Sequence, residues 1–255
     1  MTLDQLLVFG YIGYKFCIDK IETVGNRVGI TYTKNALTIF IIGLVLCAAV
    51  SYLLGTLNFA IIISKLKYKD DIRNYGSGNA GMTNMMRTYG RAAGIFTFLG
   101  DLLKAVVAVL VARFLFGDIF AYIAMFFCIL GHAFPCWYKF KGGKGVAVTC
   151  AAILCLDQIP FLCLLIIFVL IVALTKYLSL GSIMSVLMYP LILSAFYSLH
   201  PYPAYSMPFA MISSTLVTFL VLFLHRDNMK RLLNKTENKF SFKKKGTQSD
   251  KAMEE

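Results

Sequence analysis

The sequence lacks the cysteine and histidine patterns of a metalloprotein. Its seven cysteines include no Cys-x-x-Cys pair, and its three histidines have no partner at the spacing of metal ligands. Most of the cysteines lie inside apolar runs, where cysteine behaves as a small hydrophobic residue: Cys47, Cys128, Cys150, Cys155 and Cys163. The N-terminus also lacks the basic segment, apolar run and small-residue cleavage site of a secretory signal peptide. We therefore expect neither a metal site nor a cofactor.

Charged residues are scarce as well. They make up 15% of the 255 residues, whereas 58% are hydrophobic and the mean hydropathy is +0.72. A soluble domain is nearer to about 45–50% apolar. The composition therefore predicts an all-α, polytopic membrane protein with little chain left for a separate soluble domain.

Acidic residues are particularly few, with 13 Asp and Glu against 25 Lys and Arg, which gives a net charge of +12. In a soluble protein this excess would favour nucleic-acid binding. Here the basic residues cluster in loops between apolar runs, so membrane topology and anionic lipid account for them first. We expect membrane lipids, and no nucleic acid, among the partners.

The apolar runs predict about seven transmembrane helices, at residues 36–64, 92–117, 119–138, 145–156, 158–175, 183–198 and 207–224. The fourth is shorter than the roughly 20 residues of a usual crossing, so residues 145–175 form either one long helix or a hairpin of two. The connections near residues 117–118, 156–157 and 199–208 contain no Lys or Arg. Seven crossings of the cell membrane would place these connections outside, with the N-terminus, and every basic loop in the cytoplasm, with the C-terminus.

The two ends of the chain lie outside this membrane domain, which spans residues 36–239. Residues 1–35 mix apolar and charged positions, and no full span fits there. An interfacial amphipathic helix near the start is our hypothesis for them. Residues 240–255 form a polar, basic tail that we expect to be disordered in the cytoplasm.

Two charged residues interrupt the second apolar run. Asp101 and Lys104 are three positions apart and share one face of a helix. Charge inside a span is costly and marks either a functional or a paired site. A structural ion pair that holds helices together and a direct part in chemistry both remain open.

The stretch from residue 131 to 147 separates two apolar runs and contains four glycines, three lysines and His132. Glycine lets a backbone approach a ligand closely and present its N–H groups, and neighbouring lysines supply positive charge. Lys141-Gly142-Gly143-Lys144-Gly145 therefore suits a phosphate group met at a membrane surface. A cytoplasmic loop whose lysines only set the topology explains this segment equally well.

Three further polar stretches share the predicted cytoplasmic face. The segment 76–87 offers hydroxyl and amide side chains and one arginine, which can hold a phosphate with two parallel bonds: Ser77, Asn79, Thr83, Asn84 and Arg87. Ser179 and Ser182 occupy a second break. His225 and Asn228, three positions apart, can face one way on a helix after the last span. Membrane topology can explain each stretch taken alone. Several segments rich in hydrogen-bond donors for a phosphate group, all on one membrane face, are hard to explain by topology.

These stretches contain three ordered motifs. The first is Ser77-Gly78-Asn79-x-Gly81-x-Thr83-Asn84-x-x-Arg87, and the second is Gly131-His132-x-Phe134-Pro135 with Phe140-Lys141-Gly142-Gly143-Lys144-Gly145-Val146-Ala147. The third is His225-Arg226-x-Asn228-x-x-Arg231-Leu232-Leu233 with Glu237 and Lys239. Their order and content resemble the bacterial acyl-phosphate:glycerol-3-phosphate acyltransferase family of small membrane enzymes. Three positions depart from the family: Ala80 stands where proline is usual, Val148 where threonine is usual and Lys235 where glycine is usual.

The resemblance implies acyl transfer from an acyl-phosphate to the 1-hydroxyl of sn-glycerol 3-phosphate. The products are 1-acylglycerol 3-phosphate (lysophosphatidate) and inorganic phosphate, and the reaction opens phospholipid synthesis. The family does not draw its acyl group directly from acyl-CoA or acyl carrier protein. The resemblance therefore also implies a functional link to the enzyme that supplies acyl-phosphate.

Both implied substrates carry phosphate, which accounts for two cationic, glycine-rich loops. We expect the 77–84 loop, Arg87 and the 141–145 loop to bind phosphate, with further binding contacts from His132, Arg226 and Glu237. The candidate catalytic residues are His225, Asn228, Ser179 and Ser182. His225 either removes the hydroxyl proton or binds glycerol phosphate while a substrate phosphate takes the proton.

Two other acyl-transfer patterns are absent from the sequence. It contains no Gly-x-Ser-x-Gly nucleophile elbow. Other acyltransferases that make the same product use His-x-x-x-x-Asp, but here the fifth residues after the histidines are Trp137, Tyr205 and Lys230.

A transporter of phosphate or organophosphate anions is the main alternative, although the charges gather on one face and no inverted repeat is visible. A lipid-binding scaffold would explain the net charge but not the segment 77–87.

Overall fold

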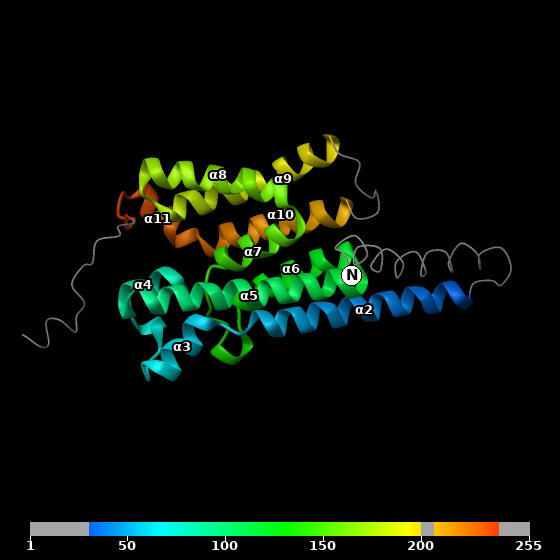
Figure 1. Cartoon of the computed structure of the whole chain (residues 1–255), viewed down its shortest axis with the longest axis horizontal. Coiled ribbons are helices and arrows are strands. Elements are labelled where there is room, and N and C mark those ends of the chain that lie inside the picture. The colour runs from blue at the N-terminus through cyan, green and yellow to red at the C-terminus, as the bar shows by residue number, and fades with distance from the viewer. Residues whose placement is uncertain (1–30, 200–206, 240–255) are drawn as a thin grey trace, which may run out of the picture.

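Helices make up the regular structure wherever this chain is described. The computed structural model describes residues 31–199 and 207–239, and these ranges contain no strand. The all-α prediction is confirmed (Figure 1). The long helices are α2 (Thr31–Gly55), α5 (Arg91–Phe116), α6 (Asp118–Ala133), α8 (Gln158–Thr175), α9 (Leu178–Leu199) and α10 (Met207–Leu224); the shorter ones are α3 (Phe59–Lys67), α4 (Met82–Tyr89), α7 (Val146–Leu156) and α11 (Arg226–Leu233), with 3-10 turns η1 (Ile72–Asn74) and η2 (Cys136–Tyr138).

Six helical segments of the described chain are long and apolar enough to cross a bilayer. A multi-pass membrane protein is therefore confirmed. The remaining apolar helix, α7, has 11 residues, or about 16 Å at the α-helical rise, roughly half of a bilayer's hydrocarbon core. The helix is interrupted at Asp157, so residues 145–175 form two helices, α7 and α8. The count of about seven thus resolves into six full spans and one short helix.

The apolar run over residues 36–64 also contains a break. Helix α2 ends at Gly55 and α3 begins at Phe59, with Asn58 capping α3 by accepting a hydrogen bond from the Ile61 N–H. The Lys104 ammonium of α5 donates to the carbonyls of Gly55 at 3.1 Å and Leu57 at 2.7 Å. A charged donor from another helix thereby satisfies carbonyl groups at the point where helical pairing is interrupted.

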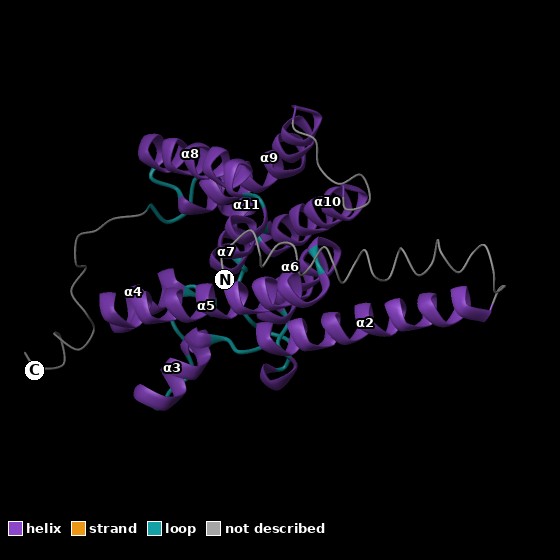
Figure 2. Ribbon diagram, turned by 45° about the vertical axis from the view of Figure 1, so that its right-hand side comes forward, coloured by secondary structure: helices purple, strands orange, loops and turns teal. Residues whose placement is uncertain are grey.

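Helix α6 lies at the centre of the bundle and packs against α2, α5, α7 and α10, while α9 joins α10 to α8 (Figure 2). Large side chains of these central helices are fully buried against one another, including Tyr122, Met125, Ile129, Tyr189 and Leu193. Helix α8 lies at the edge and exposes apolar side chains over its length. An exposed apolar face on a membrane-spanning helix is a lipid-facing surface.

The basic connections gather at one end of the bundle. Figure 1 shows α3, α4, α11 and the α8–α9 junction at this end, whereas the α5–α6 junction and the end of α9 lie at the other. This is the grouping that the charge pattern predicts. Assignment of the basic end to the cytoplasm stays a prediction from the positive-inside rule.

The hypotheses for the two ends of the chain fall mostly outside the described ranges. The tail 240–255 and residues 1–30 are not described, and residues 31–35 begin helix α2.

We expect Lys104→Met to destabilise the protein by about 3–5 kcal/mol, because it removes one partner from a buried ion pair and leaves two carbonyls without a donor. The free energy of unfolding in detergent would measure this loss. Lys230→Met, an exposed lysine on α11, is the matched control and should change stability little. Equal stability of the two variants would contradict a structural role for Lys104.

Candidate active site

The connection between α6 and α7, residues 134–145, is called the glycine-lysine loop below, and hydrogen bonds of its own backbone hold it in place. The N–H of Gly142 donates to the carbonyl of Ala133 at 3.0 Å, and that of Gly143 to the carbonyl of His132 at 3.2 Å. A Cβ atom on Gly142 would lie 2.0 Å from the His132 carbonyl oxygen, and one on Gly143 would lie 2.2 Å from the His132 ring. Close packing therefore requires both glycines.

This arrangement corrects the reason given for the glycine pair. The sequence indicated that these glycines present N–H groups to a phosphate, but both N–H groups are already bonded within the loop. The positive groups left to a ligand are Lys144 and the first turn of α7, which has Gly145 as its N-cap and no side-chain cap. The free N–H groups of a helix N-terminus favour anions.

His132 lies beneath this loop in a buried cluster of charged residues. Its Nδ1 is 2.8 Å from Nζ of Lys104 and 3.4 Å from Oδ1 of Asp101, and Lys104 and Asp101 form an ion pair at 2.8 Å. All three side chains are buried. His132, which we expected among the binding residues, thus contacts the intramembrane pair Asp101 and Lys104. It also packs against Gly142 and Gly143 and supports the loop there.

The loop over residues 76–81 is organised by Asn84. The Asn84 amide donates to the carbonyls of Tyr75 at 2.9 Å, Asn79 at 3.1 Å and Ile72 at 3.3 Å, and its oxygen accepts from the N–H of Ser77 at 3.1 Å. Asn84 is buried, so its side chain shapes the loop from within. Ser77 and Arg87 are exposed, and Asn79 and Thr83 are half-buried, which leaves these four to face a ligand.

The two loops meet at Ala80. Its carbonyl oxygen would lie 2.6 Å from a Cβ on Gly143 and accepts a hydrogen bond from Asn58. Ala80 precedes Gly81, the N-cap of α4, which also has no side-chain cap. The N-termini of α4 and α7 therefore follow two loops that contact each other. Neither N-terminus has a side-chain cap, and both contribute partial positive charge.

A second cluster forms around Glu237. One carboxylate oxygen accepts from Ser179 at 3.0 Å and from the Asn228 amide at 2.8 Å, while the other accepts from Arg231 at 2.7 Å. Burial opposes ionisation of Glu237, but the hydrogen bonds from Arg231, Asn228 and Ser179 outweigh it and hold its pKa below the ordinary value. Glu237 therefore stays charged and fixes α9 and α11 beside each other.

Lys144 connects this cluster to the glycine-lysine loop. Its ammonium donates to the side-chain oxygen of Asn228 at 2.5 Å. Burial, with help from the nearby charge of Arg231, lowers the pKa of Lys144 to about 8. Lys144 is thus mostly protonated at neutral pH, in a setting with little water to screen its charge.

Arg87 and His225 complete the set. Arg87 lies close enough to influence the pKa of Lys144, and within the described chain its guanidinium has no hydrogen bond or ion pair. His225 is buried, with Nδ1 at 2.8 Å from the Val221 carbonyl. Burial lowers the pKa of His225 to about 4, although the bond to Val221 opposes the shift. Its imidazole is therefore neutral, and donation from Nδ1 leaves Nε2 as an acceptor.

Some predicted residues point elsewhere. Ser182 donates to the Leu178 carbonyl within α9 at 2.9 Å. Arg226 bonds the Phe223 carbonyl at 3.1 Å and lies over the Phe223 ring. The Lys141 side chain is exposed. The structure therefore brings Ser179, but not Ser182 or Arg226, into the Glu237 cluster.

Sequence reasoning missed two contributors. Arg231 binds Glu237, and the third motif contains both residues, but they are six positions apart and not at the spacing of three or four that indicates a pair on a helix. Arg73 contacts the backbone carbonyls of Tyr138 and Lys141, which no residue pattern reveals. Among the described residues, no group of three or more His, Cys, Asp or Glu side chains could hold a metal ion.

Comparison with known proteins identifies the family. Residues 45–235 match the sequence profile of the family described as glycerol-3-phosphate acyltransferase. The chain belongs to this family. A glycerol-3-phosphate acyltransferase of Clostridioides difficile (strain 630) is 40% identical over 206 residues, covering 78% of this chain and 97% of the relative. One of Bacillus subtilis (strain 168) is 38% identical over 189 residues, covering 74% and 93%.

Solved structures of the family have the same fold. The crystal structure of PlsY, an integral membrane glycerol 3-phosphate acyltransferase, in its glycerol 3-phosphate form has a TM-score of 0.69 and 31% identity, covering 78% of this chain and 96% of that one. Its lysophosphatidic acid form has a TM-score of 0.67 and 29% identity, covering 78% and 95%. The family recognised from three sequence motifs is confirmed.

We expect Asn84→Ala to lower the free energy of unfolding by about 1–3 kcal/mol, because several buried backbone groups lose their hydrogen-bond partner. Limited proteolysis should also show faster cleavage within residues 75–81. Asn238→Ala, at an exposed position, serves as the control. Unchanged stability and cleavage in Asn84→Ala would show that the loop holds its shape without this side chain.

Proposed function

We propose that this protein transfers a fatty acyl group from an acyl-phosphate to the 1-hydroxyl of sn-glycerol 3-phosphate, giving lysophosphatidate and inorganic phosphate. Membership of the family supports an acyltransferase that acts on glycerol 3-phosphate. The observation that carries the finer proposal is the contact of Lys144 with Asn228, which unites the second and third motifs beside Arg87.

The phosphate of glycerol 3-phosphate would bind between Arg87 and Lys144. Arg87 offers a guanidinium with no partner among the described residues, and Lys144 offers a partly desolvated ammonium. Charge-assisted bonds from such groups to phosphate are short and strong. Ser77, Asn79 and Thr83 add neutral donors from the adjoining loop. A second phosphate, that of the donor, requires further positive potential, which the uncapped N-termini of α4 and α7 supply.

His225 is suited to orient the glycerol hydroxyl. With a pKa of about 4, it is a weak base, whereas the second ionisation of a phosphate ester has a pKa of about 6. The hydroxyl oxygen attacks the acyl carbonyl carbon, the bond from that carbon to the phosphate oxygen breaks, and the departing phosphate accepts the hydroxyl proton. The low pKa of His225 thus favours binding over proton removal, the two roles that the sequence leaves open.

Such a reaction depends on positioning and charge stabilisation more than on a strong base, because phosphate is a good leaving group. Glu237 and Ser179 would act by holding Asn228 and Arg231 in place around Lys144. The acyl chain would enter sideways from the bilayer along apolar helix faces. The partner reaction is then one that supplies acyl-phosphate at the same membrane.

The transporter alternative loses its main support. Asp101 and Lys104 suited an ion pathway in the sequence, but they pair with each other, with His132 and with backbone carbonyls, at exposures of 2%, 4% and 3% for Asp101, Lys104 and His132. Charges satisfied in this way hold helices together.

The direct test is purified protein in nanodiscs, given acyl-phosphate and glycerol 3-phosphate. We expect release of inorganic phosphate and formation of lysophosphatidate only when both substrates are present. The same assay with acyl-CoA in place of acyl-phosphate is the donor control and should give no product. Flux of glycerol 3-phosphate into liposomes without phosphate release would instead support the transporter.

We predict that Arg87→Ala and Lys144→Ala nearly abolish transfer while the protein stays folded, because each removes a positive charge from the proposed phosphate site. Losses of about 100-fold or more in kcat/KM would fit one missing charge-stabilising contact. Cys163→Ala, on α8 away from the Glu237 cluster, should leave transfer largely intact. Folded Arg87→Ala protein with normal turnover would count against the site.

The pH dependence follows from Lys144. Its pKa is about 8 in the free protein, so its charge is present below that pH and is lost as pH rises through it. We expect kcat/KM for glycerol 3-phosphate to fall above about pH 8, while the limb of kcat lies higher because bound phosphate stabilises the ammonium. In Lys144→Arg, residual activity should lose this alkaline limb. A limb retained in that variant would assign it to another group.

A further inference from the structure

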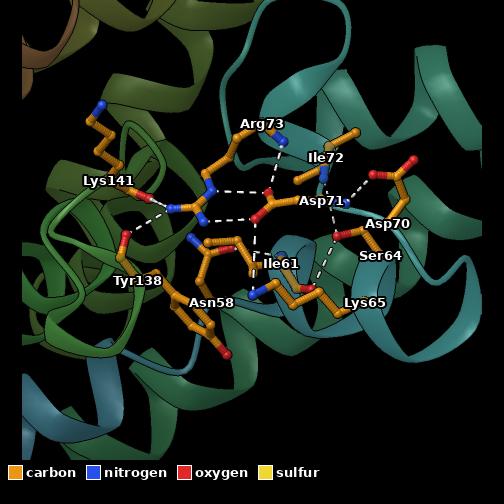
Figure 3. A network of polar contacts seen from close by, with 10 residues as sticks. All are labelled: Asn58, Ile61, Ser64, Lys65, Asp70, Asp71, Ile72, Arg73, Tyr138 and Lys141. Carbon is orange, nitrogen blue, oxygen red and sulfur yellow. Dashed lines mark hydrogen bonds and ion pairs between the residues drawn. The ribbon is translucent and has the colours of Figure 1, made fainter.

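The segment between α3 and α4 contains an ion pair that reaches across to the glycine-lysine loop (Figure 3). Arg73 Nε donates to Asp71 at 2.9 Å and Nη2 to the other carboxylate oxygen at 2.7 Å. The backbone N–H of Arg73 also donates to Asp71 at 3.0 Å. The carboxylate therefore fixes the guanidinium plane through two parallel bonds.

The remaining nitrogen of this guanidinium binds the loop. Nη1 of Arg73 donates to the Tyr138 carbonyl at 2.7 Å and to the Lys141 carbonyl at 3.0 Å. Figure 3 shows the guanidinium lying between Asp71 and these two carbonyls. One side chain thus links the start of the loop to the residue that precedes Gly142.

Between these carbonyls the backbone takes an unfavourable conformation. Lys139 and Phe140 have φ values of 58° and 55°, in the left-handed region where a side chain other than glycine is strained. Two such residues in succession persist only where their surroundings hold them. Bonds within the loop contribute, such as that from the Phe140 N–H to the Pro135 carbonyl at 3.0 Å, and Arg73 ties both ends of the strained pair from outside.

We propose that Arg73 is a positioning residue for Lys144, holding the loop 138–144 in the conformation that brings the lysine ammonium to Asn228 and to the substrate phosphate. The loop is then fixed twice: by Arg73 at Tyr138 and Lys141, and by His132 and Ala133 at Gly142 and Gly143. The consequence for catalysis rests on the phosphate-binding role proposed for Lys144.

A purely structural role predicts a different result. The Arg73 and Asp71 side chains are 21% and 20% exposed, and ion pairs with access to water contribute little to stability. Loss of the pair would then change neither stability nor activity appreciably. A positioning role predicts a loss of activity out of proportion to the loss of stability.

The test compares Arg73→Lys with the wild-type protein, because lysine keeps the charge but cannot bond Asp71 and two carbonyls with one planar group. We expect kcat/KM for glycerol 3-phosphate to fall by about 10- to 100-fold, the size of effect that a small misplacement of a binding group produces. Asp71→Asn, which leaves Arg73 without its anchor, should give a smaller loss in the same direction and covers the case in which Arg73→Lys fails to fold. Lys67→Gln, an exposed position on α3, is the matched control and should behave as wild type.

A substrate-free readout separates this proposal from the proposed function. The rate at which an amine-reactive reagent labels Lys144 is followed by mass spectrometry over a range of pH, so that the rate constant of the neutral amine is separated from its pKa. This rate constant should rise several-fold in Arg73→Lys and stay unchanged in Lys67→Gln. The alkaline limb of kcat/KM should also move to higher pH, since a loosened loop lets water reach Lys144. The charged groups around Lys144 stay in place in these variants: Arg87 on α4, Asp227 and Arg231 on α11, Glu237 after it, and neutral His225 before it.

Wild-type labelling of Lys144 in folded Arg73→Lys would overturn the positioning role, whatever the activity. Faster labelling with lower kcat/KM would support it. Faster labelling with unchanged kcat/KM, in a protein whose Lys144→Ala variant is also active, would uphold the positioning and overturn the phosphate-binding role of Lys144.

Discussion

The Lys104 ammonium is the point on which the rest of the structure depends. It donates to two carbonyls at the α2–α3 break, pairs with Asp101 and touches the ring of His132. In a membrane interior every polar group needs a partner within the protein, so these contacts stabilise one another as a set. His132 supports Gly142 and Gly143 with its carbonyl and its ring. Through these contacts the buried cluster also fixes the position of the loop that carries Lys144.

A second polar cluster is assembled above this one from segments far apart in the sequence. Glu237 gathers Ser179, Asn228 and Arg231, and Asn228 receives Lys144. The carboxylate balances one of several positive charges, so a positive surplus remains, which the proposed phosphate site would use. A cluster held in this way is preorganised, and in the proposed reaction it would raise the rate by positioning and charge stabilisation, without a strong base.

Much of the fold could be predicted from the sequence, because long apolar runs and the alternation of basic loops report directly on burial in a bilayer. The meeting of Lys144 and Asn228 followed from placing their motifs on one membrane face. The α2–α3 break did not, since it depends on a donor from α5. Nor did the roles of Asn84 and Arg73, because both act through backbone carbonyls, which are the same at every residue and leave no mark in a sequence. His132 looked like a ligand-binding residue because its two charged neighbours belong to another helix.

The steric confinement of Gly142 and Gly143 bears on how this family changes over evolution. Any side chain at either position would collide with His132, so a descendant that retained the packing but abandoned the reaction would still carry the glycine pair. Arg87, which makes no contact that the described fold requires, would be free to change in a relative that had lost the proposed reaction. In divergent relatives, loss of the arginine with retention of the glycines would therefore identify chains that have kept the architecture and changed their chemistry.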